Sequence, residues 1–226
     1  LLVYASHFRE DFEDAQGYGW TMGEPSFSWS TLIGNKDKEI ARLERVYEGL
    51  LERAGAKLLR GTARVVGANA VEMDGRRITA RYILVATGGW PFKPALPGIE
   101  HAITSNEAFE LAEQPRRVLV VGGGYIAVEF AGIFRGLGSE VTLSYRGERI
   151  LRGFDDDVRV HVQEEMGKKG VRFLLRSAVA GIERGADGAL TVRFGDGLAP
   201  LRVDAVMFAT GRLPSTRGLG LQEAGV

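Results

Sequence analysis

The segment Gly122–Glu129, with the sequence GGGYIAVE, has small residues at the spacing of a dinucleotide-binding turn. Gly122 permits a tight turn, Gly124 lets backbone N–H groups approach a pyrophosphate, and Ala127 lets a following helix pack close to a sheet. The N-terminus of that helix would offer free N–H groups and a partial positive charge to the phosphates. A glycine-rich turn that binds nothing is the alternative, so the flanking elements decide the prediction.

The flanking segments have the order that this chemistry requires. Residues 117–121 form an apolar, β-branched run, which predicts a buried parallel strand. Residues 125–137 predict a helix, and Gly138 is suited to end it. Because strand, glycine turn and helix follow one another directly, we predict a dinucleotide site at the start of this helix.

The next predicted strand, residues 140–145, indicates which dinucleotide binds. Its end lies about 20 residues after the first glycine, where an enzyme preferring NAD would have an acidic residue for the ribose 2′-hydroxyl. Ser144 and Tyr145 occupy this place, and three arginines follow: Arg146, Arg149 and Arg152. Guanidinium groups match a 2′-phosphate bidentately. We therefore predict NADPH, held by Arg146 and Arg152; the alternative is that the three arginines are a solvated basic loop.

Composition excludes little but is consistent with a small-molecule enzyme. The 226 residues include 29 Lys+Arg and 29 Asp+Glu, so no charge excess indicates a nucleic acid or a membrane surface as partner. No apolar run approaches the length that crosses a bilayer, and we expect a cytoplasmic protein. His7, His101 and His161 are too dispersed for a metal site. Asp155–Asp157 are placed to cap a helix, so we predict no metal.

A wider comparison of motifs identifies a family resemblance. The segments Gly122–Phe134 and Ile150–Asp155 resemble the NADPH-binding domain of the glutathione reductases, a family of FAD- and NADPH-dependent disulfide reductases. The similarity continues through Leu84–Gly89 and Ala209–Pro214, reaches back to Leu1–Ser6, and covers the whole chain. It implies an α/β fold, in which a Rossmann-like NADPH domain is inserted in an incomplete FAD-binding domain. Both are expected to have three layers, with a parallel sheet and an antiparallel β-meander.

The resemblance also shows what the sequence lacks. The family exchanges thiols and disulfides through a Cys-x₄-Cys pair, and this sequence contains no cysteine. The glycine motif that would bind the FAD pyrophosphate and the acid/base His–Glu pair are absent as well. We therefore expect an internal fragment of a longer reductase that is inactive alone.

Three regions are predicted along the chain. Residues 1–88 are expected to be a partial FAD-binding domain, residues 89–214 the NADPH-binding domain, and residues 215–226 the start of a truncated central domain. Within the first region we predict two helices and several short strands, and we expect apolar helix and sheet faces to be exposed. These helices are placed at 1–15 and 28–54, and the strands at 57–59, 63–66, 70–73 and 82–86.

The resemblance assigns roles to single residues of the NADPH domain. Tyr125 matches the tyrosine whose ring covers the flavin until NADPH displaces it, and Glu129 matches an acid that pairs with a lysine beside the redox disulfide. Ile126 and Gly211 match positions that line the nicotinamide nucleotide. An ordinary packed aromatic and a first-turn helix acid are the alternatives for Tyr125 and Glu129.

Further residues match positions near FAD and near the substrate. Ser105 can equally be explained as a helix N-cap, and Tyr47, which matches a tyrosine at bound glutathione, can be explained as a core residue of its helix. We expect little or no FAD to be retained, since its pyrophosphate site is absent. The residues matched to FAD are Gly61, Ala63, Thr87, Gly88, Ser105 and Arg212.

The implied activity is that of a glutathione-disulfide reductase. A hydride from NADPH would pass through FAD to a redox disulfide that reduces oxidised glutathione, and the whole enzyme would be a homodimer. Two alternatives stay open: a sister enzyme, such as a trypanothione, dihydrolipoamide or mercuric reductase, and a stand-alone nucleotide-binding module. The arginines argue against dihydrolipoamide dehydrogenase, which uses NAD, and Tyr47 argues against a mercuric reductase.

Overall fold

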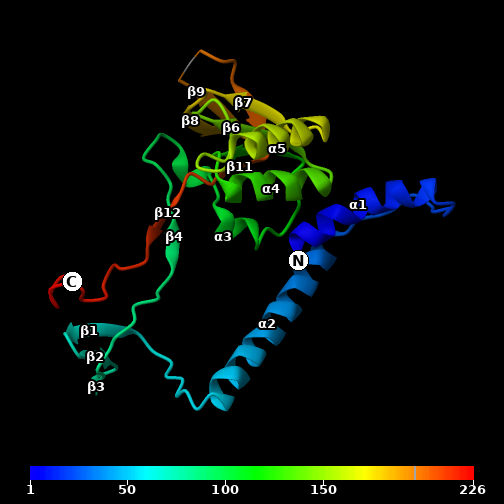
Figure 1. The fold of residues 1–226 in the computed structure, drawn as a ribbon. Helices are drawn as coiled ribbons and strands as arrows, with labels where there is room; N and C mark the ends of the chain where they lie inside the picture. The colour runs from blue at the N-terminus through cyan, green and yellow to red at the C-terminus, as the bar shows by residue number, and fades with distance from the viewer. Residues whose placement is uncertain (196) are drawn as a thin grey trace. The chain divides into compact units, whose positions relative to one another are not determined.

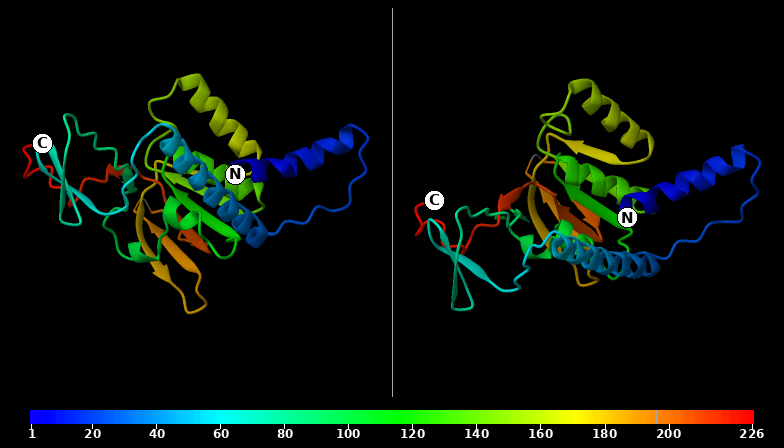
Figure 2. Two further views of the ribbon diagram at one scale, coloured as in Figure 1. Left: turned by 90° about the horizontal axis from the view of Figure 1, so that it is seen from below. Right: turned by 60° about the horizontal axis from the view of Figure 1, so that its bottom comes forward.

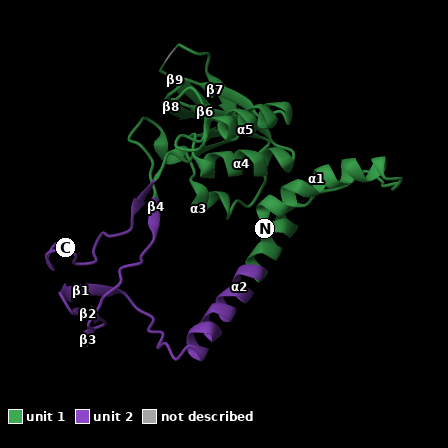
Figure 3. Ribbon diagram, viewed as in Figure 1, with its two compact units in different colours: residues 1–38, 91–211 green, residues 39–90, 212–226 purple. Residues whose placement is uncertain are grey.

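The computed structural model describes residues 1–195 and 197–226, which form an α/β fold (Figure 1). The chain divides into two compact units (Figure 3). Unit 1 contains residues 1–38 and 91–211, and unit 2 contains residues 39–90 and 212–226. No helix in the described part of the chain is long and apolar enough to cross a membrane.

Most predicted elements are present at nearly the predicted bounds. The helices are α1 (Leu2–Gly17), α2 (Trp29–Arg53), α3 (Ser105–Ala108), α4 (Tyr125–Gly136) and α5 (Asp156–Lys168), with a 3-10 turn η1 (Ile99–His101). The strands are β1 (Ala63–Gly67), β2 (Ala70–Met73), β3 (Arg76–Thr79), β4 (Gly89–Pro91), β5 (Arg117–Val121), β6 (Glu140–Tyr145), β7 (Arg172–Leu175), β8 (Val179–Arg184), β9 (Leu190–Phe194), β10 (Leu201–Val203), β11 (Ala205–Phe208) and β12 (Arg212–Pro214).

Unit 1 is built around a parallel sheet with the strand order β11-β5-β6-β7. Val121 at the end of β5 lies beside Ser144 of β6 and Phe208 of β11, so these strands end at one edge of the sheet. The connections run through α4 between β5 and β6 and through α5 between β6 and β7. In such open sheets, ligands bind beyond the carboxyl ends of the strands.

Both faces of the parallel sheet are covered (Figure 2). Val118 and Val120 of β5 pack in one core with residues of α4 such as Phe134. Leu119 and Val121 belong to a second core, formed with the antiparallel sheet β10-β9-β8. Because successive side chains of a strand point to opposite faces, a strand that is buried on both needs an unbroken apolar run.

Ionic and capping contacts hold the ends of unit 1 elements. The Asp204 carboxylate, just before β11, accepts hydrogen bonds from the backbone N–H of Arg117 at 2.8 Å and from its guanidinium Nη2 at 2.5 Å. The hydrogen bond from the Arg117 side chain lowers the pKa of Asp204 below its ordinary value. Asp155 caps α5 as predicted, by accepting from the N–H of Asp157 at 3.0 Å.

Helix α1 and the start of α2 belong to unit 1. A Cβ on Gly136 of α4 would lie 2.6 Å from the backbone oxygen of Ser6, so glycine allows α1 to approach α4 closely. Trp29, the first residue of α2, donates its indole N–H to the Leu111 carbonyl at 2.7 Å. These two contacts connect residues 1–38 with residues 91–211 within unit 1.

Unit 2 contains the small antiparallel sheet β1-β2-β3. Asp74 and Gly75, at φ of +50° and +75°, form the predicted turn between β2 and β3. Two positive φ values at consecutive turn residues are typical of type I′ hairpins. Strand β1 is also joined to the C-terminal segment, because Val65 N–H donates to the Leu219 carbonyl at 2.8 Å.

Three predictions of local structure are wrong. Residues 57–59 and 82–86 form no strand, and Leu84 is 90% exposed. An extended segment needs a neighbour for its N–H and C=O groups, and no described segment pairs with either one. The N-cap of α3 is Thr104 and not Ser105: the Thr104 hydroxyl accepts from the N–H of Asn106 at 3.2 Å, and Ser105 is the first helical residue.

Candidate dinucleotide-binding site

The turn after β5 can be made only by glycine at its first position. Gly122 is buried, has a φ of +143°, and donates its N–H to the Ser144 carbonyl at 2.9 Å. A Cβ at this position would collide with the carbonyl oxygen of Ala209. The third small residue, Ala127, is fully buried in the core between α4 and the sheet. The packing therefore agrees with the predicted roles of these residues: Gly122 permits the tight turn, and Ala127 lets α4 lie close to the sheet.

Gly124 differs from Gly122 because it faces open space. It is exposed, it is the N-cap of α4 with an ordinary φ of −85°, and a Cβ there would have no atom within 4 Å. The first N–H groups of a helix lack intrahelical acceptors. A glycine with free space at this point leaves them accessible to an anion. The residues present thus fit the pyrophosphate of a dinucleotide.

Tyr145, at the end of β6, packs on the glycine turn. A Cβ on Gly123 would lie 2.6 Å from the Tyr145 ring, and a Cβ on Gly147 would lie 2.5 Å from it. Ser144 is fully buried, with its hydroxyl 3.4 Å from that of Ser177. The position of the NAD-selective acid is thus filled by a ring packed against backbone, and no carboxylate opposes a 2′-phosphate here.

The arginines that follow β6 differ in their partners. Arg146 and Arg152 are exposed and form no ion pair with any described residue. Arg149 lies 4.0 Å from a carboxylate oxygen of Asp156. The guanidinium groups of Arg146 and Arg152 are therefore free to bind an anion, which is the chemistry predicted for them.

The residues predicted at the nicotinamide end lie on α4 and after β11. Tyr125 is the first residue of α4 and its side chain is 57% exposed, whereas Ile126 is half-buried against the core. Gly211 has a φ of +142° and accepts the N–H of Phe92 at 2.9 Å. Since β11 and β5 are neighbours, the structure brings Gly211 and the start of α4 to the same edge of the sheet.

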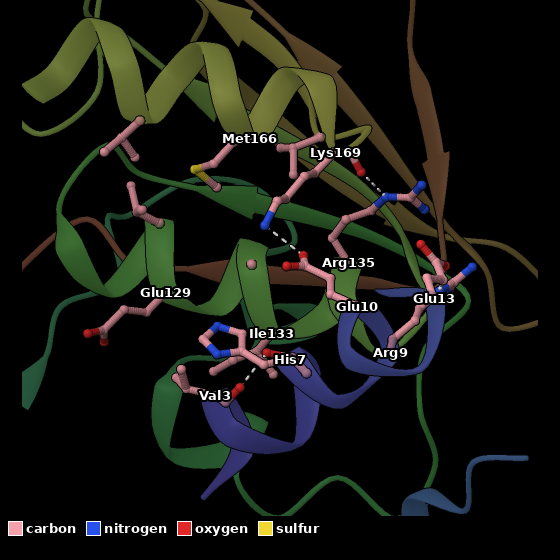
Figure 4. Close-up of a pocket in the computed structure, with 16 residues that line it drawn as sticks. Val3, His7, Arg9, Glu10, Glu13, Glu129, Ile133, Arg135, Met166 and Lys169 are labelled. Carbon is pink, nitrogen blue, oxygen red and sulfur yellow. Dashed lines mark hydrogen bonds and ion pairs between the residues drawn. The ribbon is translucent and has the colours of Figure 1, made fainter. Parts of the chain in front are cut away.

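Glu129 lies on the next turn of α4 and borders a separate cavity (Figure 4). This cavity of about 440 Å³ lies between α1, α4 and α5, and no other predicted site residue lines it. Glu10 of α1 and Lys169 form an ion pair of 2.6 Å across it. Arg9 and Glu13 of α1 form a second ion pair in the lining, and Arg135 donates its Nε to the Lys169 carbonyl at 2.6 Å. The other polar side chains that line the cavity are Ser6, His7 and Glu129.

The residues matched to FAD are spread over both units. Ser105 is buried in unit 1, and the other five belong to unit 2, so the structure does not describe them as one site. Thr87 donates its hydroxyl to the Ser215 carbonyl at 2.7 Å, and Arg212 donates to the Gly89 carbonyl. Gly88 accepts the N–H of Ser215 at 3.0 Å, and Gly61 and Ala63 are exposed before and at the start of β1.

Tyr47, the residue matched to the substrate, is 65% exposed on α2 in unit 2. The explanation of Tyr47 as a core residue therefore does not hold within the described chain. Sequence reasoning did not identify Arg159 of α5, whose guanidinium donates to the backbone carbonyls of Arg149 and Ile150. The only signal in the sequence was its spacing from Asp156, which fits an ordinary helical ion pair.

Comparison with known proteins gives a consistent result. A family model described as pyridine nucleotide-disulphide oxidoreductase matches residues 3–226. Glutathione reductases from Nostoc sp. and Burkholderia cepacia are 46% and 48% identical over the whole chain. A trypanothione reductase from Trypanosoma congolense is 38% identical. The chain spans about half of each relative: 49%, 50% and 49% of their lengths.

Solved structures agree with the fold. The HOCl-induced flavoprotein disulfide reductase RclA from Escherichia coli matches the whole chain with a TM-score of 0.82 and 25% identity. The chain corresponds to 48% of that protein. The mixed α/β fold, with parallel and antiparallel sheets, is therefore the fold of part of a flavoprotein disulfide reductase, as predicted.

Proposed function

Because the chain belongs to the pyridine nucleotide-disulphide oxidoreductase family, we propose that it is part of a glutathione-disulfide reductase and supplies the NADPH-binding site of that enzyme. The observation that supports this most is the open glycine turn at the start of α4 beside two exposed arginines. In such an enzyme NADPH supplies a hydride that reaches a redox disulfide through FAD, and the resulting thiols reduce oxidised glutathione.

The residues of the turn and loop divide the dinucleotide between them. Gly122 and Gly124 shape the backbone so that the first N–H groups of α4 bind the pyrophosphate. Ala127 holds the helix against the sheet. Arg146 and Arg152 bind the 2′-phosphate by charged hydrogen bonds, which selects NADPH over NADH.

Other residues have supporting roles in the proposal. Ile126 and Gly211 line the nicotinamide end, and Tyr125 covers the position at which hydride transfer takes place and excludes water from it until the dinucleotide binds. Glu129 orients a cationic partner near the flavin. Tyr47 contributes a hydroxyl to the binding of oxidised glutathione. The FAD wall of this chain would consist of Gly61, Ala63, Thr87, Gly88, Ser105 and Arg212.

The proposal also covers the organisation of the chain. Residues 1–88 would form part of an FAD-binding domain, residues 89–214 the NADPH-binding domain, and residues 215–226 the start of a central domain. We further propose that the enzyme is a cytoplasmic homodimer without nucleic-acid or membrane partners. Since the sequence contains no cysteine, the chain cannot itself carry out the disulfide step.

Glutathione is favoured over trypanothione as the substrate by sequence identity, at 46–48% against 38%. The test of the cofactor assignment is a fluorescence titration of the chain with NADPH and NADH. We expect micromolar binding of NADPH and binding of NADH that is about 100-fold weaker, as follows from two charged hydrogen bonds to the 2′-phosphate. Equal affinities would contradict the NADPH assignment and favour an NAD-linked relative.

A further inference from the structure

The arginine loop, residues 146–154, is anchored by its middle. Ile150 is fully buried and Leu151 is 7% exposed, whereas Arg146 and Arg152 on either side are exposed. Leu151 also adopts a φ of +56°, which is uncommon for a residue other than glycine. The buried centre fixes the path of the backbone that presents the two free guanidinium groups.

The loop is joined to the glycine turn by a direct hydrogen bond. The N–H of Leu151 donates to the Gly123 carbonyl at 2.5 Å, and the Tyr145 ring packs against Gly123 and Gly147. The backbone that would bind the pyrophosphate and the loop that would bind the 2′-phosphate are therefore parts of one connected structure.

Arg159 of α5 is the main side-chain anchor of this loop. Its Nε donates to the Ile150 carbonyl at 2.9 Å and its Nη2 to the Arg149 carbonyl at 3.1 Å. Its Nη1 donates to the Asp156 carboxylate at 2.6 Å, and the side chain is only 19% exposed. Gln163, one turn further along α5, accepts the N–H of Ile150 at 3.3 Å. All three nitrogens of the guanidinium are thus engaged within the protein.

We propose that Arg159 is a positioning residue for NADPH selectivity: it holds the 146–154 loop so that Arg146 and Arg152 are presented to the 2′-phosphate. The inference rests on the proposed function. A loop that is ordered before binding does not lose its conformational freedom when the ligand arrives, and affinity rises accordingly. The planar guanidinium suits this role, since its donors form a rigid fork that reaches two carbonyls and a carboxylate together.

A lysine could not replace these contacts. Its single ammonium group has the same charge but lacks the fork. Charge and geometry are therefore separable by experiment. If Arg159 acted by attracting the phosphate directly, Arg159→Lys would keep most of the affinity, whereas a positioning role requires the arginine itself.

The test is a fluorescence titration of the 226-residue chain with NADPH and NADH for Arg159→Gln and Arg159→Lys. Arg193→Gln is the matched control, because it removes one positive charge from unit 1 at an ion pair with Glu183 on β8. We expect both Arg159 variants to raise the Kd of NADPH about tenfold, with the Kd of NADH changed less than twofold, and the control to bind like the parent chain.

Each other outcome overturns the inference. Unchanged NADPH affinity in Arg159→Gln would show that the loop does not need this anchor. Full affinity in Arg159→Lys would show that charge alone matters, and equal weakening of NADPH and NADH would show a general structural defect. The parent chain and the double variant Arg146→Ala/Arg152→Ala, titrated in parallel, separate this inference from the proposed function. If the parent chain does not prefer NADPH, or the double variant keeps that preference, the proposed cofactor assignment fails, whatever the Arg159 variants show.

Discussion

Removal of both free arginines, Arg146→Ala/Arg152→Ala, should abolish the preference for NADPH without unfolding the protein. Neither side chain has an ion-pair partner among the described residues, so their loss leaves no opposing charge unpaired. Exposed substitutions of this kind usually change stability by less than about 0.5 kcal/mol. The whole effect should therefore appear in binding.

The size of the expected loss of NADPH affinity follows from the exposure of the two guanidinium groups. Hydrogen bonds to charged groups contribute about 1.5–3 kcal/mol each, and solvent-exposed groups belong at the lower end of this range. Two bonds of about 1.5 kcal/mol sum to about 3 kcal/mol, and each 1.4 kcal/mol corresponds to a factor of ten. We expect a Kd for NADPH that is about 100-fold higher and an unchanged Kd for NADH.

The assay is a fluorescence titration with each dinucleotide, with thermal unfolding recorded on the same samples. The control is Arg184→Ala/Arg193→Ala, which removes two positive charges from β8 and β9 of the same unit. A similar loss in this control would mean that the net charge of unit 1 attracts NADPH. Retention of selectivity by Arg146→Ala/Arg152→Ala would refute the assignment of these residues to the 2′-phosphate.

Four further predictions test the site and the stability of the chain. Gly122→Ala should lower the free energy of unfolding, measured by urea denaturation, by about 2–3 kcal/mol. The reason is that alanine would have to adopt a positive φ and its Cβ would clash with the Ala209 carbonyl oxygen. Gly124→Ala should leave unfolding unchanged and weaken NADPH at least tenfold, since its Cβ would enter the space left for the pyrophosphate; equal stability of the two variants would contradict the packing at Gly122. The purified chain should retain no flavin absorbance after incubation with FAD and dialysis, because the sequence lacks the glycine motif that would bind the FAD pyrophosphate; retained flavin would mean that the chain binds FAD without that motif. It should also show no NADPH oxidation by oxidised glutathione, because it contains no cysteine. Asp204 has a pKa below its unfolded value of about 3.9, so its stabilising contribution is complete above that pH and is lost as the pH falls through the folded-state pKa. Asp204→Asn should therefore reduce the fall in the free energy of unfolding between about pH 5 and 2. An unchanged dependence on pH would show that Asp204 does not contribute to the loss of stability in acid.

Much of unit 1 could be predicted from the sequence because its signals are local. The apolar run of β5, the glycine turn and the helix α4 appear within residues 117–137, and their bounds differ from the prediction by at most one residue. The hairpin at Asp74 and Gly75 was likewise indicated by two adjacent residues that tolerate positive φ.

The failures concern segments whose structure depends on a partner. Residues 82–86 are apolar enough for a buried strand, but a strand exists only where another segment pairs with it. The capping of α3 was assigned one residue too late, because Thr104 and Ser105 are chemically equivalent candidates. The hydroxyl geometry alone shows that Thr104 accepts the helix N–H.

The sequence by itself determined that a tight glycine turn follows β5 and leads into a closely packed helix, since glycine at positive φ and small residues at fixed spacing are requirements of the local backbone. It also determined that Ser144 and Tyr145 stand where an NAD-selective acid would lie, and that arginines follow them. Only the tertiary structure decided which arginines are free and which are engaged: Arg159 donates to loop carbonyls, whereas Arg146 and Arg152 face solvent. The physical reason is that residue type fixes what a side chain can bind, while the path of the chain fixes which partner is within reach.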